Sequence, residues 1–217
     1  AFASFAEELE KELFSREMRL VIGTRAGRKA ECERYTRDIA RRGADGIVGV
    51  ATPESICEFA ARTGIPFVDV GAGKREGKFR RVVMDLRKAG LLLAEQLWEK
   101  GHRRIVCAGG VSPAEPDERF SSIVRYFEER GGRADVVARE TRNHATFDYE
   151  LLGADLAGQI LSLKERPTGI VFYNDARAFG GMKALLAMGF SIPGDFSVAS
   201  FDNVPMAGLM TPGLTSV

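Results

Sequence analysis

Short apolar runs alternate with amphipathic segments along this chain. Runs such as Ile47–Val50 and Gly169–Tyr173 are rich in Val, Ile and Phe, which is typical of buried parallel strands. Between the runs, apolar side chains recur at helical spacing, as they do from Phe5 to Phe14. The expected strands cover residues 20–23, 47–50, 67–70, 82–84, 105–110, 134–137, 169–173 and 196–201, and the expected helices cover residues 5–14, 31–42, 53–62, 85–100, 118–131, 147–162 and 176–188. This alternation predicts an α/β fold of βα units on parallel sheets, with right-handed crossovers.

The series of strands and helices runs twice, with a change near His102. We therefore expect an N-terminal lobe over residues 1–102, a C-terminal lobe over residues 103–212, and the start of a return segment to the first lobe over residues 213–217. Each lobe is predicted to be a doubly wound parallel sheet. Two such lobes place a ligand cleft between them, at the carboxyl ends of the strands.

Composition narrows the class of protein. The chain has 31 lysine and arginine residues against 30 aspartate and glutamate residues, so its net charge is +1. This balance excludes a strongly basic arm of the kind that drives non-specific DNA binding. No apolar run approaches the roughly 20 residues that a membrane span needs, and no signal peptide is visible. Because the chain starts without Met in what reads as the first turn of a helix, we expect a fragment.

Cysteine and histidine usage argues against several kinds of site. The odd number of widely spaced cysteines favours buried free thiols over disulfides, which fits a cytoplasmic protein; they are Cys32, Cys57 and Cys107. The two histidines, His102 and His144, form no cluster with cysteine, so no metal is expected, and His102 reads as a helix-end residue. The loop over residues 71–78 fits neither glycine-rich phosphate-binding pattern and reads as a surface turn, so no cofactor is expected.

Five stretches together resemble a known family. They cover residues 101–110, 166–175, 176–189, 192–203 and 209–217. The most specific part is Pro-x-Asp-x-Ser-Val from Pro193, followed by Phe-Asp-Asn from Phe201 and by Thr-Pro-x-Leu-Thr from Thr211. In this order and spacing they resemble the effector-binding core of LacI-type bacterial transcription regulators, whose fold is like that of type I periplasmic binding proteins. The resemblance extends from Phe5 to Val217.

The resemblance also implies parts that this chain lacks. Such regulators begin with a helix-turn-helix DNA-binding segment of about 60 residues. The first strand of the N-terminal lobe is expected to be missing too, because Phe5 already lies in the first helix. A tail would re-enter the N-terminal lobe after Val217. The near-neutral charge agrees with this interpretation, since the groups that contact phosphate would belong to the absent segment.

Two polar residues at strand ends are the first effector-binding candidates that the resemblance implies. Asp202 follows an apolar strand, and its carboxylate suits hydroxyl or amine groups of a ligand, although a turn or capping role is the alternative. Asn174 follows another strand, and its amide can both donate and accept. The alternative for Asn174 is an N-cap, a role that Asp175 would serve equally well. The resemblance assigns Asn174 to the ligand and Asp175 to structure.

The remaining candidates are Arg119, Phe147 and Asp85. Arg119 matches a guanidinium that holds the ligand, but Asp117 replaces one of two arginines common here, and Ser122 stands where Gly is usual. Asp117 therefore either favours a cationic ligand or pairs with Arg119, and a plain surface ion pair is equally compatible. Phe147 matches an aromatic that stacks on the ligand, with a core aromatic as the alternative. Asp85 matches an acid near the lobe junction and is also placed to cap a helix.

The function that these expectations support is sensing. A small polar metabolite, sugar-like or nucleoside-like, would bind between the lobes and change operator DNA binding through the missing helix-turn-helix segment. A homodimer is expected, with residues 31–42 and 85–100 among its faces, and no membrane partner. One alternative is a transport solute-binding protein of the same fold. Another is an α/β enzyme that uses Asp85, Asp175 or Asp202 as acid or base, but the chain has no nucleophile elbow, phosphate loop or metal cluster.

Overall fold

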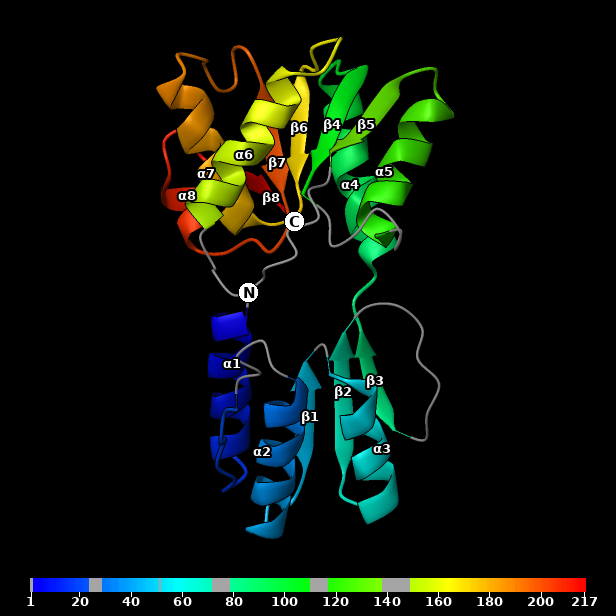
Figure 1. Cartoon of the computed structure of the whole chain (residues 1–217), viewed down its shortest axis with the longest axis vertical. Helices are drawn as coiled ribbons and strands as arrows, with labels where there is room; N and C mark the ends of the chain where they lie inside the picture. Colours follow the sequence, from blue (N-terminus) through cyan, green and yellow to red (C-terminus); the bar gives the residue numbers. More distant parts are fainter. Residues whose placement is uncertain (1, 24–28, 51, 72–78, 110–116, 138–148) are drawn as a thin grey trace. The chain divides into compact units, whose positions relative to one another are not determined.

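The computed structural model describes residues 2–23, 29–50, 52–71, 79–109, 117–137 and 149–217. Within these ranges the chain forms two compact units, Phe2–Asp85 and Leu86–Val217 (Figure 1). Every pair of neighbouring strands in the described residues is parallel, as the alternation of strands and helices predicts. None of the helices in this part of the chain is long and apolar enough to span a membrane.

The Phe2–Asp85 unit holds a three-stranded sheet in the order β1-β2-β3. Its elements are α1 (Phe2–Phe14), α2 (Lys29–Arg41), β1 (Ile47–Val50), α3 (Glu54–Thr63), β2 (Phe67–Gly71) and β3 (Arg80–Val83). Helix α3 packs its buried face against β2, and the core is small; its buried residues are Ile56, Cys57, Ala60 and Phe67. Pro53, expected in the first turn of α3, takes the N-cap position instead.

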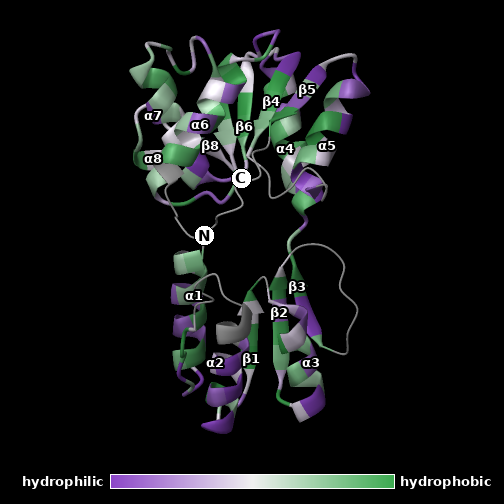
Figure 2. Cartoon of the chain, viewed as in Figure 1, coloured by the Kyte–Doolittle hydropathy of each residue, from purple (hydrophilic) through white to green (hydrophobic). Residues whose placement is uncertain are grey.

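The Leu86–Val217 unit holds a five-stranded sheet in the order β5-β4-β6-β7-β8. Its elements are α4 (Leu86–Glu99), β4 (Arg104–Ala108), α5 (Glu118–Glu128), β5 (Arg133–Val137), α6 (Tyr149–Leu161), β6 (Gly169–Phe172), α7 (Asp175–Ala187), β7 (Ser197–Ser200), α8 (Met206–Leu209) and β8 (Thr215–Ser216). The short elements α8 and β8 are the two that the apolar pattern does not predict. Strands β4 and β6 are coloured mainly as hydrophobic in Figure 2, in keeping with their burial on both faces.

Helices cover both faces of this larger sheet. On β4, Ile105 and Cys107 point into a core shared with α4 and α5. The intervening Val106 and Ala108 point into a second core shared with α6 and α7. All four side chains are fully buried, which explains why this strand is an unbroken apolar run. The predicted doubly wound parallel sheet is confirmed for this unit.

One expectation for the start of the chain is wrong. Residues Leu20–Gly23 are not a buried strand: they pair with none of the described strands, and Val21 and Ile22 are 63% and 51% exposed. Helix α1 forms, but it buries no residue, and Phe14 is 80% exposed. An apolar run becomes a strand only where a neighbouring strand accepts and donates its backbone hydrogen bonds, and no described strand does so here.

The structure also places the unit boundary earlier than the sequence pattern does. Helix α4, expected in the first lobe, packs against α5 and contributes Leu93 and Leu97 to the core of the Leu86–Val217 unit. The helices meet at Gly90, where a Cβ would lie 2.2 Å from the Ser122 hydroxyl. The predicted boundary after residue 102 therefore falls inside this unit. Residues 213–217 also stay with it, because β8 pairs with β7.

Candidate functional site

The strand order of the larger sheet indicates where a ligand would bind. From β4 the chain moves outward to β5, then crosses to β6 on the other side of β4 and continues outward to β7 and β8. In open parallel α/β sheets, ligands bind where the strand order reverses in this way, at the carboxyl ends of the two strands, which here are β4 and β6. Asp117 and Arg119 follow β4 at the start of α5, Tyr173 and Asn174 follow β6, and Asp202 follows β7.

Arg119 and Asp117 form a two-point ion pair at this edge. The Arg119 Nε donates to Asp117 Oδ1 at 3.0 Å, and Nη2 donates to Oδ2 at 2.8 Å. Only 10% and 13% of the two side chains is exposed, so this is not a surface pair. Of the alternatives for Asp117, the structure therefore shows the pair with Arg119. Asp117 also caps α5, because Oδ1 accepts the Arg119 backbone N–H at 2.9 Å.

Aromatic rings hold the guanidinium in place. Arg119 stacks on the Tyr173 ring at 3.8 Å from its centroid, and Phe201 lies at 5.2 Å on β7's carboxyl side. The Arg119 Nη1 also donates to the Tyr173 carbonyl at 3.3 Å. Burial raises the pKa of the Tyr173 phenol, against the opposing effect of the Arg119 charge. Sequence reasoning missed Tyr173 and Phe201 as site residues, although each is the aromatic that directly precedes a candidate, Asn174 and Asp202.

Asn174 is confirmed as the N-cap of α7, which was the alternative to a ligand role. Its Oδ1 accepts the Arg177 backbone N–H at 3.1 Å. Asp175, the other residue considered for this cap, turns inward and is fully buried. The cap uses the amide oxygen, so the Nδ2 group is the part of Asn174 that would donate to a ligand. A ligand role for Asn174 stays a prediction.

Asp175 has the structural role that the resemblance implies. Its carboxylate accepts the Val204 backbone N–H at 2.8 Å and the Ser216 hydroxyl at 2.6 Å. The Ser200 hydroxyl donates to the same carboxylate. One buried group thus joins α7, β7, β8 and the segment after Asp202.

Asp202 lies at the same edge and is held by its backbone. Its N–H donates to the Val217 carbonyl at 2.9 Å, and its φ of 109° lies in the region that favours glycine. A strained backbone at the end of a strand is typical of sites where a side chain must point in a fixed direction. The side chain is exposed, yet surrounding protein removes enough water to raise the pKa of the Asp202 carboxyl, and nearby Asp175 raises it further.

The other two candidates, Asp85 and Phe147, stay predictions. Asp85 is the last residue of the Phe2–Asp85 unit, exposed and directly before α4. Phe147 lies outside the described residues, so its role stays a prediction. The predicted placement of the ligand between two lobes also stays a prediction. Four acidic, basic and amide side chains do gather at the β4–β6 edge: Asp117, Arg119, Asn174 and Asp202.

The residues that sequence analysis set aside have ordinary structural roles where they are described. Cys57 and Cys107 are buried free thiols, and burial raises the pKa of the Cys107 thiol above its usual range. His102 follows α4, its Nδ1 lies 2.8 Å from the Thr168 hydroxyl, and burial lowers its pKa. No group of His, Cys, Asp or Glu in the described ranges could hold a metal ion. Residues 72–78, His144 and the side chain of Cys32 lie outside the description.

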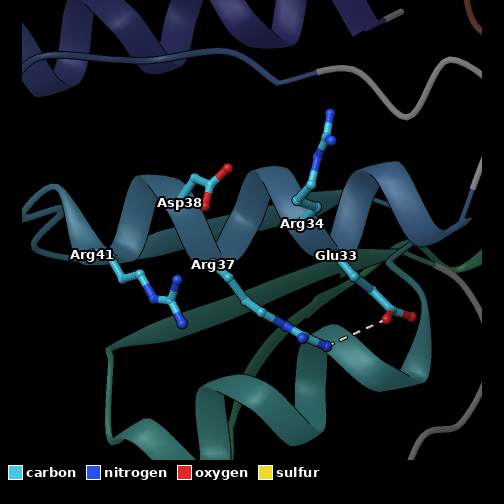
Figure 3. A pocket seen from close by; sticks show the side chains of 5 residues that line it. All are labelled: Glu33, Arg34, Arg37, Asp38 and Arg41. Carbon is cyan, nitrogen blue, oxygen red and sulfur yellow. Dashed lines mark ion pairs between the residues drawn. The ribbon is translucent and has the colours of Figure 1, made fainter.

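A hollow on α2 offers no comparable chemistry (Figure 3). Its walls are charged side chains of one helix: Glu33, Arg34, Arg37, Asp38 and Arg41. Arg37 pairs with Glu33 at 3.5 Å, and Arg34 points away from that pair in Figure 3. Such interspersed charges on an exposed helix are typical of a solvated face.

Comparisons with known proteins agree with the fold. Residues 94–217, more than half of the chain, match the model of the periplasmic binding protein-like domain. The transcriptional repressor PurR of Vibrio atlanticus is 28% identical over the whole chain, and that of Erwinia tasmaniensis is 29% identical. The chain spans 65% and 64% of the length of these two relatives.

Solved structures of LacI family regulators share the fold of this chain. A LacI family transcriptional regulator from Enterococcus faecalis, solved with bound ribose, is 25% identical, with a TM-score of 0.77 over 99% of this chain and 78% of that one. A LacI family regulator from Lactobacillus casei, solved with bound glucose, has a TM-score of 0.80 at 21% identity over 99% of this chain and 81% of that one, which shows the shared fold. The chain belongs to the periplasmic binding protein-like domain family, and the relatives that it resembles include LacI family regulators.

Proposed function

We propose that this chain is the effector-sensing part of a transcription regulator. It binds a small hydroxyl-rich metabolite, a sugar or a sugar-like molecule, at the carboxyl edge of β4, β6 and β7. The observation that carries the proposal is the set of side chains gathered there around the Asp117–Arg119 pair, in a chain of the LacI type. The ribose bound to the Enterococcus faecalis relative supports a sugar as the ligand class.

The roles of the side chains follow from their hydrogen-bonding groups. The exposed Asp202 carboxylate accepts hydrogen bonds from two hydroxyls of a ligand, a geometry suited to a diol. Asn174 donates from Nδ2, since its oxygen caps α7. Arg119 supports the edge of the site by stacking on the Tyr173 ring. Phe147 and Asp85 are two further residues that we propose as ligand contacts.

Regulation is the second half of the proposal. Relatives of this chain are repressors of the helix-turn-helix type. We infer that the intact protein is a cytoplasmic homodimer whose DNA-binding segments recognise two operator half-sites at a fixed spacing. Ligand binding favours one conformation of the sensing part and thereby changes operator affinity.

A binding screen tests the sensing part. Ribose and glucose at 100 times their Kd should stabilise the chain by about 2.7 kcal/mol, which thermal denaturation detects readily. Asp202→Asn should weaken binding at least about tenfold, because an amide replaces one acceptor oxygen with a donor. Asp45→Asn, an exposed acid of the other unit, is the matched control and should leave binding unchanged. Equal affinity in all three proteins would contradict the assignment of Asp202.

An operator titration tests the regulatory part. The intact protein is titrated with operator DNA selected from a random-sequence pool, with and without the sugar found in the screen. We expect operator affinity to change several-fold when the sugar is present. An operator affinity that is the same with and without saturating sugar would refute the regulatory half of the proposal.

A further inference from the structure

Each nitrogen of the Arg119 guanidinium already donates a hydrogen bond to another group of this protein. Two of its nitrogens bind the two oxygens of Asp117, at 3.0 and 2.8 Å, and the third donates to the Tyr173 carbonyl at 3.3 Å. An arginine fork presents two parallel N–H groups to a carboxylate or phosphate of a ligand. Here the carboxylate of Asp117, a residue of the same chain, already accepts hydrogen bonds from these N–H groups.

Asp117 also occupies the start of α5. Its Oδ1 accepts the Arg119 backbone N–H, and its carbonyl accepts the Ser121 backbone N–H at 2.9 Å. A helix N-terminus after a strand is a common place for an anionic ligand group to bind. The same carboxylate therefore fills both groups that would otherwise attract an anion, the fork and the helix end.

Burial strengthens the electrostatic attraction between Arg119 and Asp117. Since only 10% of the Arg119 side chain and 13% of the Asp117 side chain is exposed, solvent screens their attraction poorly. In agreement, the Arg119 hydrogen bonds and charge hold the pKa of Asp117 below its usual value despite burial. The pKa of Arg119 is raised, because hydrogen bonding to Asp117 and nearby acids outweighs burial.

The charges around the pair leave no excess of positive charge in the described part of this edge. Two guanidinium groups, those of Arg119 and Arg177, face the carboxylates of Asp117, Asp175 and Asp202. Asp202 interacts electrostatically with both arginines. In the described part of this edge, an incoming phosphate or carboxylate would therefore meet the negative charges of Asp117 and Asp202 beside the two guanidinium groups.

We propose that Asp117 sets the charge class of the effector, so that the site accepts neutral polyhydroxylated ligands and rejects their phosphorylated or carboxylated forms. The proposal rests on the proposed function and goes beyond it by naming the residue that discriminates between ligands. Asp117 acts by neutralising Arg119 and by repelling anions, not by a bond to the neutral ligand.

The variant Asp117→Asn tests the role of the negative charge, because it removes the charge of Asp117 and keeps a capping side chain. Asparagine is as good an N-cap as aspartate, so α5 keeps its first turn. It has one acceptor oxygen and no charge, so one edge of the Arg119 fork becomes available. Asp117→Ser is a second variant that keeps the cap and frees the whole fork. Fluorescence of Trp98, the single tryptophan of the chain, which packs on Phe127 in the same unit, reports whether each variant folds.

Asp135→Asn is the matched control. Asp135 also pairs with an arginine two residues away, its Oδ1 accepting from the Arg133 Nε at 2.8 Å. That pair is on β5, with the Arg133 side chain 60% exposed, and it does not belong to the carboxyl edge of β4 and β6. The control removes the same charge from the same unit without touching the candidate site.

The measurement is a ratio of affinities. Calorimetry gives Kd for ribose and ribose 5-phosphate, and for glucose and glucose 6-phosphate, with the wild-type chain and the three variants. The wild-type chain should prefer the neutral sugar, and Asp117→Asn and Asp117→Ser should reduce that preference at least about tenfold. The reduction should shrink as salt is raised, and Asp135→Asn should match the wild type. A wild-type chain that binds both forms equally, or an unchanged ratio in folded Asp117 variants, would overturn the proposal.

A second probe separates this proposal from the proposed function. Inorganic phosphate should raise the Tm of the Asp117 variants and not that of the wild type or of Asp135→Asn. If no sugar binds any protein but phosphate acts in this way, the sugar-sensing function fails while the charge selection stands. If sugars bind but neither the ratio nor the phosphate effect depends on Asp117, the charge selection fails while the sensing function stands.

Discussion

Replacing Asp175 with alanine should destabilise the Leu86–Val217 unit by about 3–5 kcal/mol. The Asp175 side chain is fully buried and accepts hydrogen bonds from Ser200, Val204 and Ser216. Alanine leaves the buried Ser200 hydroxyl and the Val204 N–H without their acceptor, at about 1–3 kcal/mol each. The Ser216 hydroxyl is partly exposed and regains water, so its loss adds less than about 1 kcal/mol.

Urea denaturation followed by Trp98 fluorescence measures this cost. Trp98 lies in α4 and packs edge-on against Tyr126 and Phe127, so its signal reports the unit that contains Asp175. With an m value of about 2 kcal/mol/M, a loss of 4 kcal/mol lowers the urea midpoint by about 2 M. Asp175→Asn keeps one acceptor oxygen and should lose about half as much.

The neighbouring acid gives the control. Asp202 lies two residues after β7, whose Ser200 binds Asp175, but its side chain is exposed, so Asp202→Ala should cost less than about 1 kcal/mol. If Asp175→Ala and Asp202→Ala lower the midpoint equally, or if Asp175→Ala costs less than about 1 kcal/mol, the buried carboxylate does not organise this end of the sheet. Asp175 would then not have the structural role assigned to it, and Asp202 would not be distinguished as the acid that is available to a ligand.

Three further predictions concern packing, reactivity and pH. Gly153→Ala should cost several kcal/mol of stability, because its Cβ would lie 2.3 Å from the α7 backbone. On the same helix, a Cβ at Gly158 meets nothing within 4 Å, so Gly158→Ala should stabilise the chain by up to about 1 kcal/mol. Thermal melting of both variants measures these two changes. Cys107, fully buried with a raised thiol pKa, should stay unlabelled by iodoacetamide in the native chain and react only in urea, as mass spectrometry of its peptide would show. Because Arg119 holds the Asp117 pKa below its ordinary 3.8, their pair stabilises the fold fully above that value and progressively less as pH falls toward the lowered one. Urea midpoints from about pH 5 downward should therefore fall more steeply for the wild type than for Asp117→Asn, and equal slopes would refute the pair's contribution.

The site was predictable only in part. That Asn174 and Asp202 lie at one edge follows from parallel strands, because residues directly after each strand meet at the same end of a sheet. The pairing of Arg119 with Asp117 could only be offered as one of several alternatives, since residues two apart at the start of a helix face each other only when the first takes the cap position. The Tyr173 ring on which Arg119 stacks comes from 54 residues away in the chain, and its place directly before Asn174 does not say which side chain it contacts.

The sequence by itself determined the parallel α/β architecture of this chain and most of its elements. Local apolar runs and helical spacing are sufficient for that, because they record which faces must be buried. Tertiary structure decided where one unit ends and the next begins, since α4 joins the second unit through its contact with α5 at Gly90. It also decided that residues 20–23 are not a strand, because a strand exists only with a hydrogen-bonding neighbour. Tertiary structure also decided that the Arg119 charge is neutralised by Asp117, because the two side chains are buried together as a pair. Residue type alone does not say which ligand a charged side chain can bind.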